Sequence, residues 1–193
     1  MRILCWAAWG LACLLAWAGC VPAAAPAPAQ PTVPLIAADG AAQDARAIAS
    51  ASKLTAFVFF STHCHCLDAH EGRLRALAEA YTPRGVRFVM VDSEVASSRE
   101  LDAQEAKRRG YPFPIVGDHG AKLANAVGAQ YATFTVLVDT TGRVLYRGGI
   151  DSDKKTLHAD AQMFLRDALD DVLAGRRPRI AEGKTLGCAL QKD

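Results

Sequence analysis

The stretch LTAFVFFSTHCHCLDAH, residues 54–70, decides the fold. Its first seven residues, Leu54–Phe60, form a continuous apolar run, which is typical of a strand buried on both faces of a sheet. From His70 to Tyr81 the apolar side chains recur as they do on one face of a helix. The polar residues between these segments therefore lie where a central strand ends and a helix begins. Cys64 and Cys66 stand in this turn.

The same alternation of strands and helices continues along the chain. Strands are expected over Val86–Val91, 113–116, 133–139 and 143–148, and helices from the Ser97/Ser98 cap to Arg109, over 121–127 and over 160–174. The turn Thr140-Thr141-Gly142 joins the last two strands as a hairpin. Residues 35–50 fit either a hairpin around Asp39-Gly40 or a short helix over 41–50. This order predicts an α/β domain with a mixed sheet and helices on both faces.

Composition places the chain in a globular, mixed-charge class. It has 193 residues, 51% of them hydrophobic and 22% charged, and a formal net charge of +2. The run from Ile3 to Gly19 carries no charge. The 22 basic and 20 acidic side chains therefore lie almost entirely in the rest of the chain, which is nearly neutral. A nearly neutral body argues against a nucleic-acid partner and against a polybasic membrane-surface module.

The N-terminus is expected to be an export signal. Arg2 followed by the apolar run Ile3–Trp17 matches a signal peptide. Ala18-Gly19-Cys20 resembles the lipobox of bacterial lipoproteins, although Trp17 stands where an aliphatic residue is usual. We therefore expect a periplasmic or cell-envelope protein that Cys20 anchors to a membrane through a lipid. Ordinary cleavage after Val21, or an uncleaved anchor, are the alternatives.

These features divide the chain into four parts. Residues 1–19 are the expected signal peptide and 20–34 an Ala/Pro-rich linker, which favours extended polyproline structure. Residues 35–175 are the expected folded domain, and 176–193 a C-terminal tail that carries Cys188.

Cysteine usage indicates thiol chemistry. Outside the leader and Cys20, only Cys64, Cys66 and Cys188 remain, too few for a disulfide-stapled scaffold and odd in number. At a helix N-terminus, unpaired N–H groups and the helix dipole stabilise a thiolate. Cys64 is therefore the expected nucleophile, with a lowered pKa. Either Cys66 or Cys188 is the expected resolving thiol, the latter if the glycine-containing tail travels to the site.

Histidines surround the two neighbouring cysteines and leave a second interpretation open. His63 and His65 are expected to tune the pKa of Cys64 as exposed turn residues. Alternatively, these two histidines with Cys64 and Cys66 form a copper(I) or zinc site, because thiols and imidazoles are good ligands for both ions. Such a site calls for a distant ligand, and His119 and His158 are the candidates. The main interpretation requires no cofactor.

Four segments together resemble the thioredoxin-like redoxins, the AhpC/TSA and TlpA-like branch of the thioredoxin fold. They read FFSTHC, GVRFVMVDSE, RRGYPFPIVGD and FTVLVDTTGRVLYRGGID, and the resemblance covers residues 35–175. It implies a thioredoxin-like mixed sheet and an oxidoreductase that exchanges thiols and disulfides or reduces peroxides. Its substrate would be a protein or small-molecule disulfide or a peroxide, and an electron donor that the sequence does not identify would be needed.

The departures from this family are specific. A thioredoxin-type C-x-x-C is absent, since Cys66 follows Cys64 one residue early. Residues two apart on a helix point about 200° away from each other, so a Cys64–Cys66 disulfide would need an unwound first turn. A peroxiredoxin-like P-x-x-x-T/S-x-x-C is matched by Ser61 and Cys64, but Phe57 replaces its proline. The peroxiredoxin-like pattern also has an arginine just before the strand TFTVLVD, where this chain has Ala129, Gln130 and Tyr131, so peroxide reduction is expected to be weak.

Overall fold

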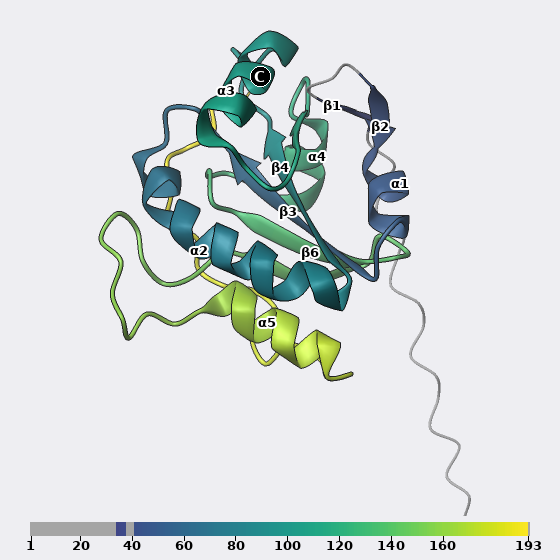
Figure 1. Ribbon diagram of the computed structural model, residues 1–193, viewed down its shortest axis with the longest axis vertical. Helices are drawn as coiled ribbons and strands as arrows, with labels where there is room; N and C mark the ends of the chain where they lie inside the picture. Colours follow the sequence, from purple (N-terminus) through teal and green to yellow (C-terminus); the bar gives the residue numbers. More distant parts are fainter. Residues whose placement is uncertain (1–33, 38–40, 193) are drawn as a thin grey trace, which may run out of the picture.

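A mixed sheet of seven strands organises the part of the chain that the computed structural model describes, residues 34–37 and 41–192 (Figure 1). The strand order is β2-β1-β5-β4-β3-β6-β7. The strands are β1 (Pro34–Ala37), β2 (Ala42–Asp44), β3 (Leu54–Phe60), β4 (Val86–Asp92), β5 (Ile115–Gly117), β6 (Thr135–Asp139) and β7 (Val144–Gly148). In the middle of the sheet, β3 pairs in parallel with β4 and antiparallel with β6. The predicted α/β fold with a mixed sheet is confirmed.

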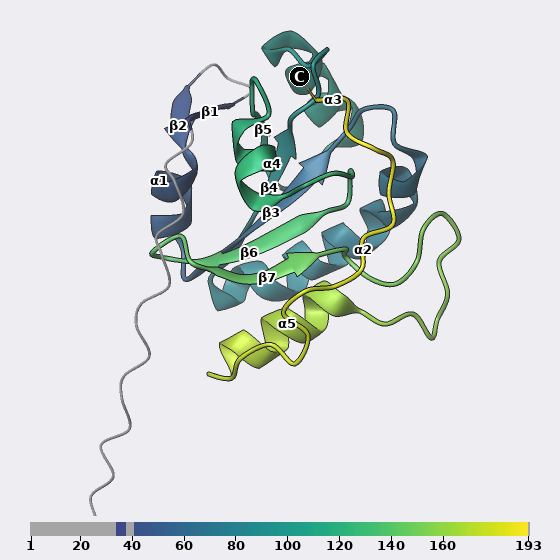
Figure 2. The ribbon, with the colours of Figure 1, turned by 180° about the vertical axis from the view of Figure 1, so that it is seen from behind.

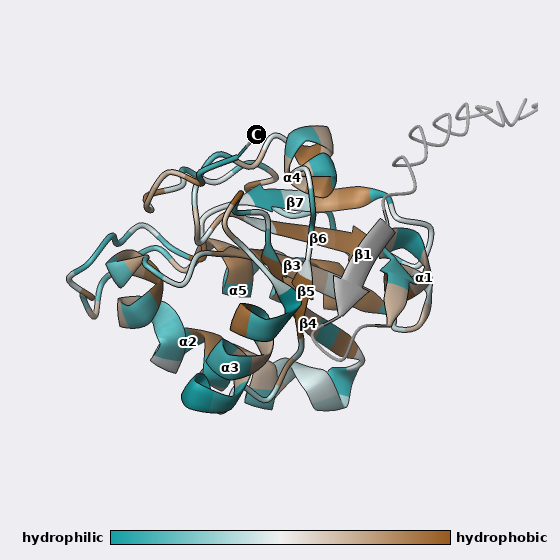
Figure 3. Ribbon diagram, turned by 90° about the horizontal axis from the view of Figure 1, so that it is seen from above, coloured by the Kyte–Doolittle hydropathy of each residue, from teal (hydrophilic) through white to brown (hydrophobic). Residues whose placement is uncertain are grey.

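Helices cover both faces of this sheet. α2 (His65–Tyr81) and α5 (Phe164–Leu173) lie on one face, and α1 (Ala45–Ser50) and α4 (Lys122–Val127) lie on the other (Figures 1 and 2). α3 (Arg99–Arg109) connects β4 to β5, and a 3-10 turn, Thr82–Arg84, follows α2. Figure 3 shows the hydrophobic residues concentrated on the central strands and the hydrophilic ones on α3. Every residue of β3 is buried, as its apolar run predicts.

Local signals set most element ends. Ser98 caps α3 by accepting a hydrogen bond from the N–H of Leu101 at 3.2 Å, and Gly110 ends it in the left-handed conformation with φ 55°. Residues 42–50 form both a strand and a helix, so the two alternatives for this region are each partly right. α2 begins at His65, five residues earlier than its apolar spacing predicts, because the turn residues Cys66 and Leu67 are also buried against the sheet.

The C-terminal tail is fixed to the domain (Figure 2). The N–H of Arg147 donates to the carbonyl of Ala181, and the N–H of Gly183 donates back to the carbonyl of Arg147, both at 2.9 Å. Further along, the N–H of Leu190 donates to the carbonyl of Gln130 at 2.9 Å. The expectation that Cys188 travels on a free tail is therefore wrong, since backbone pairing already holds it in place.

The signal peptide, Cys20 and nearly all of the expected linker lie outside the described residues. Among the residues that are described, no helix has the length and apolar character needed to cross a membrane.

Candidate functional site at three cysteines

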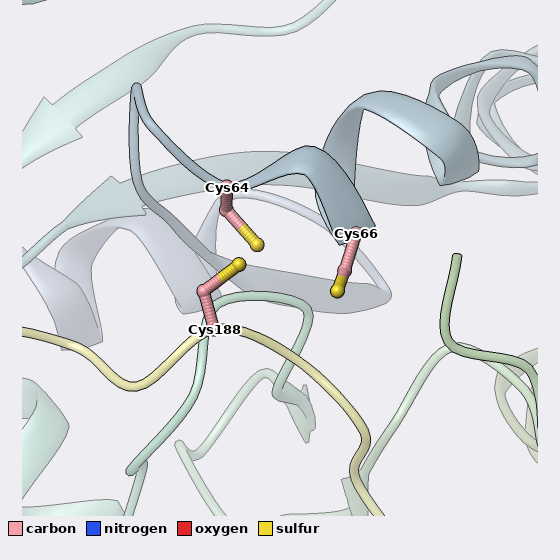
Figure 4. Close-up of side chains that lie close together, drawn as sticks. All are labelled: Cys64, Cys66 and Cys188. Carbon is pink, nitrogen blue, oxygen red and sulfur yellow. The ribbon is translucent and has the colours of Figure 1, made fainter.

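Three thiols that are distant in sequence meet at the N-terminal end of α2. The sulfur atoms of Cys64, Cys66 and Cys188 all lie within 4.8 Å of one another, and all three cysteines are free. Figure 4 shows the Cys64 and Cys188 side chains pointing toward each other, with the Cys66 sulfur beside them. Cys64 and Cys66 are fully buried, whereas Cys188 is partly exposed.

The turn after β3 places the first two cysteines on the same side. The N–H of Cys64 donates to the carbonyl of Ser61 at 3.2 Å, and the N–H of Asp68 donates to the carbonyl of Cys64 at 3.1 Å. Cys64 is the cap residue of α2 and has extended backbone angles, φ −90° and ψ 99°, whereas Cys66 lies within the helix. The predicted divergence of residues two apart applies only inside a helix. Because Cys64 lies just outside it, both sulfurs reach the same space.

The third cysteine comes from the tail. The N–H of Ala132 donates to the carbonyl of Cys188 at 2.9 Å, and Tyr131 and Ala189 form an isolated antiparallel bridge. A side chain at Gly187 would collide with the carbonyl of Ala132, so glycine permits this close approach. The segment 130–133 is itself tied to the central strand through Thr133, whose N–H donates to the carbonyl of Phe59 at 2.9 Å. β3 therefore positions both sides of the site.

The three thiols do not ionise equally. Burial raises the pKa of Cys64 to about 12, and burial also raises the pKa of Cys66. Partial burial opposes ionisation of Cys188 too. There, however, hydrogen bonds from the Cys64 thiol and the Cys66 backbone N–H lower the pKa below its usual value. The tail covers Cys64 and excludes water from it, and this burial opposes the lowered pKa expected for Cys64 from its place at a helix N-terminus.

The histidines expected to act on Cys64 point elsewhere. His63 Nδ1 lies 2.9 Å from the Thr62 hydroxyl, and His65, whose side chain is 80% exposed, lies 3.4 Å from the carboxylate of Asp68. Within residues 41–192, the group with metal-ligand geometry consists of the three cysteines and includes no histidine. His158 instead lies 2.7 Å from a carboxylate oxygen of Asp153.

A buried histidine, His70, holds the backbone of Cys66. His70 Nδ1 donates to the carbonyl of Cys66 at 2.7 Å, and its Nε2 donates to Asp151 at 3.0 Å. Although burial opposes ionisation, the Asp151 carboxylate raises the pKa of His70, as an imidazole that donates from both nitrogens requires. Arg73 completes the network with bonds of 2.6 Å to Asp151 and 2.8 Å to Asp153. The spacing of His70 from Cys66 is helical, but nothing in the sequence identifies Asp151 as its partner.

Arg109 also lies close to the turn that carries the cysteines. A basic residue in the last turn of a helix is ordinarily solvated, yet only 2% of the Arg109 side chain is exposed. Its guanidinium binds Asp68 at 2.8 Å, contacts Glu71 and Glu105, and reaches the carbonyl of Thr62 at 3.5 Å. It therefore connects the end of α3 to the turn that carries the cysteines, and carboxylates balance its charge.

The mixed sheet and the thiols clustered at the strand-to-helix turn place this chain among the thioredoxin-like proteins. Comparison with known proteins identifies its family. The family model for redoxins matches residues 22–162, more than half of the chain, so the chain belongs to the redoxin family. No curated protein matches the sequence.

Solved structures agree with this fold. An uncharacterised conserved protein from Geobacillus kaustophilus is 26% identical with a TM-score of 0.76, covering 86% of this chain and 91% of its own. A putative protein disulfide isomerase from Bacteroides thetaiotaomicron is 14% identical with a TM-score of 0.55, covering 75% and 85%. The peroxidoxin BcpB from Mycobacterium tuberculosis is 17% identical with a TM-score of 0.52, covering 76% and 94%. The last two similarities show the fold alone. Family and site together support a thiol-based redox protein.

Proposed function

We propose that this protein is an exported thiol–disulfide oxidoreductase whose redox pair is Cys64 and Cys188. The observation that carries the proposal is the convergence of three free sulfurs within 4.8 Å, with the Cys64 and Cys188 side chains facing each other. Two thiols in this relation form a disulfide by exchange with a substrate disulfide.

Cys188 is the thiol that attacks the substrate first. It is the most exposed of the three thiols and the one with a lowered pKa. Its thiolate attacks one sulfur of the substrate disulfide, so that a mixed disulfide forms and the first substrate thiolate leaves and takes a proton from water. This exchanges the roles that the sequence suggests for Cys64 and Cys188.

Cys64 completes the exchange. Once the Cys188 sulfur is bonded to substrate, it no longer carries the charge that opposes ionisation of Cys64. Cys64 then loses its proton and attacks the Cys188 sulfur, and the second substrate thiolate leaves and is protonated. Two protein thiols are oxidised to one disulfide, and one substrate disulfide is reduced to two thiols. Cys66 stays reduced and stabilises the Cys188 thiolate through its backbone N–H.

Peroxide reduction is the alternative activity, and the site favours it less. A guanidinium that polarises a peroxide must face the attacking thiolate. The nearby guanidinium of Arg109 is instead bound to the carboxylates of Asp68, Glu71 and Glu105. Ser61 is present, with its carbonyl accepting from the N–H of Cys64. Loss of one preorganised donor to a developing charge lowers the rate about 10²–10³-fold in comparable sites. Disulfide exchange needs less such assistance.

Stopped-flow mixing of the reduced protein with a chromogenic aromatic disulfide, and separately with hydrogen peroxide, tests this function. The background protein carries Cys5→Ser, Cys13→Ser and Cys20→Ser, so that only the site reacts. We expect fast disulfide exchange that Cys188→Ser abolishes and the matched control Cys66→Ser retains, and peroxide oxidation at least about 100-fold slower. Faster oxidation by peroxide than by the disulfide would make the protein a peroxidase.

Export and lipid anchoring are part of the proposal and rest on the leader sequence. Intact-mass analysis of protein extracted from membranes should show an N-terminus at an acylated Cys20. A different N-terminus or the absence of an acyl group would refute the anchor without affecting the redox chemistry.

A further inference from the structure

We propose that the reduced protein binds one copper(I) ion through the sulfur atoms of Cys64, Cys66 and Cys188. The ligand set differs from the one that the sequence suggests, because His63 and His65 point away and Cys188 takes their place. This site uses the same thiols as the proposed redox reaction, but it does not depend on that reaction.

The spacing of the sulfurs fits one small ion. Three thiolates around a common centre at about 2.3 Å, a typical metal–sulfur distance, lie about 4 Å from one another. The three sulfurs lie within 4.8 Å of one another before any ion is present, so only small side-chain adjustments are needed. Each sulfur comes from a backbone position fixed by hydrogen bonds, two at the start of α2 and one on the paired tail.

The donor chemistry favours copper(I) over zinc. Soft thiolate ligands select copper(I), which accepts low coordination numbers, whereas structural zinc sites almost always have four protein ligands. Within residues 41–192 the cluster offers three ligands, and His158 and His65 are engaged with carboxylates. Burial of Cys64 and Cys66 limits access of water as a fourth ligand.

The charge of the complex is partly offset by the protein. Copper(I) displaces three thiol protons, which go to solvent, and leaves a complex of net charge −2 with no change of oxidation state. Backbone N–H groups of Leu67 and Cys188 donate toward the Cys64 sulfur, and that of Cys66 donates toward the Cys188 sulfur. Lys154 acts on Cys66 and Lys155 on Cys188 as nearby positive charges.

Oxygen-free titration with copper(I), in competition with a chromophoric copper(I) chelator, tests the site. The full-length chain carries Cys5→Ser, Cys13→Ser and Cys20→Ser so that leader thiols do not contribute. We expect one copper(I) per chain, and a loss of affinity of at least about 100-fold in Cys188→Ser and in Cys66→Ser. The matched control, His63→Ala with His65→Ala, should bind as tightly as the parent.

X-ray absorption of the loaded protein gives an independent readout that does not depend on variants. The proposal predicts three sulfur neighbours and no nitrogen neighbour. It would be overturned by failure to bind copper(I), by full affinity in a folded Cys188→Ser protein, by nitrogen ligation that disappears with His63 and His65, or by zinc binding that withstands a copper(I) competitor. Because disulfide exchange is measured without metal, failure here leaves the proposed function intact.

Discussion

The backbone N–H of Ala132 donates a 2.9 Å hydrogen bond to the carbonyl of Cys188. This bond fixes a cysteine near the end of the chain beside the segment that leads into β6, and with it the third thiol of the site. The next residues extend the pairing through Leu190, whose N–H donates to Gln130. The tail is therefore a structural component of the three-cysteine site, although in sequence it follows the last helix.

Replacing Gly187 with alanine should displace the tail and slow formation of the internal disulfide. The added methyl group would collide with the carbonyl of Ala132, which is backbone and cannot rotate away. Overpacking of this kind typically destabilises by about 1–3 kcal/mol. We expect the rate of thiol loss on oxidation by a small disulfide to fall at least tenfold, about the effect of 1.4 kcal/mol.

Gly72→Ala is the matched control for that substitution. Gly72 lies in α2, and a methyl group there would meet no atom within 4 Å. Alanine in the helix interior should stabilise it by about 0.5–1 kcal/mol and leave the oxidation rate unchanged. Equal rates in Gly187→Ala and in this control would show that the tail does not position Cys188.

Cys188 should be the thiol that reacts first with iodoacetamide near neutral pH. Its pKa is lowered by hydrogen bonds from Cys64 and Cys66, whereas burial raises the pKa of Cys64 to about 12. Since only the thiolate reacts, the rate for Cys188 should exceed that for Cys64 at least about tenfold at pH 7. Peptide mapping of the alkylated sites over time provides the measurement, and faster labelling of Cys64 would restore the assignment made from sequence.

Arg109→Ala should destabilise the protein by about 2–3 kcal/mol. The substitution leaves the carboxylates of Asp68 and Glu71 without their shared cation, whereas Glu105 keeps Arg108, and these carboxylates are partly exposed, which limits the effect. Arg108, whose side chain is 62% exposed, provides the control, and its alanine variant should lose less than about 1 kcal/mol. Urea unfolding measures both, and similar losses would mean that Arg109 acts as an ordinary surface residue.

Stability should fall as the pH rises from 5 to 7 because of a buried pair of carboxyl groups. Burial and the neighbouring Asp92 raise the pKa of Asp102 to about 8, while burial also raises the pKa of Asp92. The folded chain thus holds a proton that the unfolded chain has already lost above about pH 4, so the free energy of unfolding decreases with pH in this window.

Asp102→Asn isolates this effect. The amide is neutral at every pH and can still donate a hydrogen bond to Asp92, so the variant should lose about 2 kcal/mol less than the parent between pH 5 and 7. His119 and Glu94, which also act on Asp92, remain in both proteins. So does His70, whose raised pKa makes stability fall as pH rises through it. Urea unfolding at the two pH values gives the comparison, and parallel curves would exclude a shared proton.

Local patterns predict the elements better than they predict the site. The apolar run of β3 and the Ser98 and Gly110 caps of α3 can be recognised from residues next to one another in the sequence, and the structure confirms them. The pairing of the tail with residues 130–132 is long-range and has no periodic signal. The raised pKa of Cys64 has the same long-range origin. A helix N-terminus favours a thiolate, but the tail that covers Cys64 removes water, and burial has the larger effect.

The burial of Arg109 likewise cannot be predicted from local sequence patterns. A basic residue in the last turn of a helix is ordinarily solvated and favourable there. Its burial follows from Asp68 and Glu71 on α2, whose position beside α3 no local pattern reveals.

Disulfide mapping of the oxidised protein tests the central claim most directly. Trypsin separates Cys188, in the peptide of residues 185–192, from Cys64 and Cys66, which share residues 54–73. Oxidation with one equivalent of a small disulfide should join these two peptides, and fragmentation should place the bond on Cys64 with Cys66 free to be alkylated. A bond between Cys64 and Cys66, with Cys188 alkylated, would contradict the account.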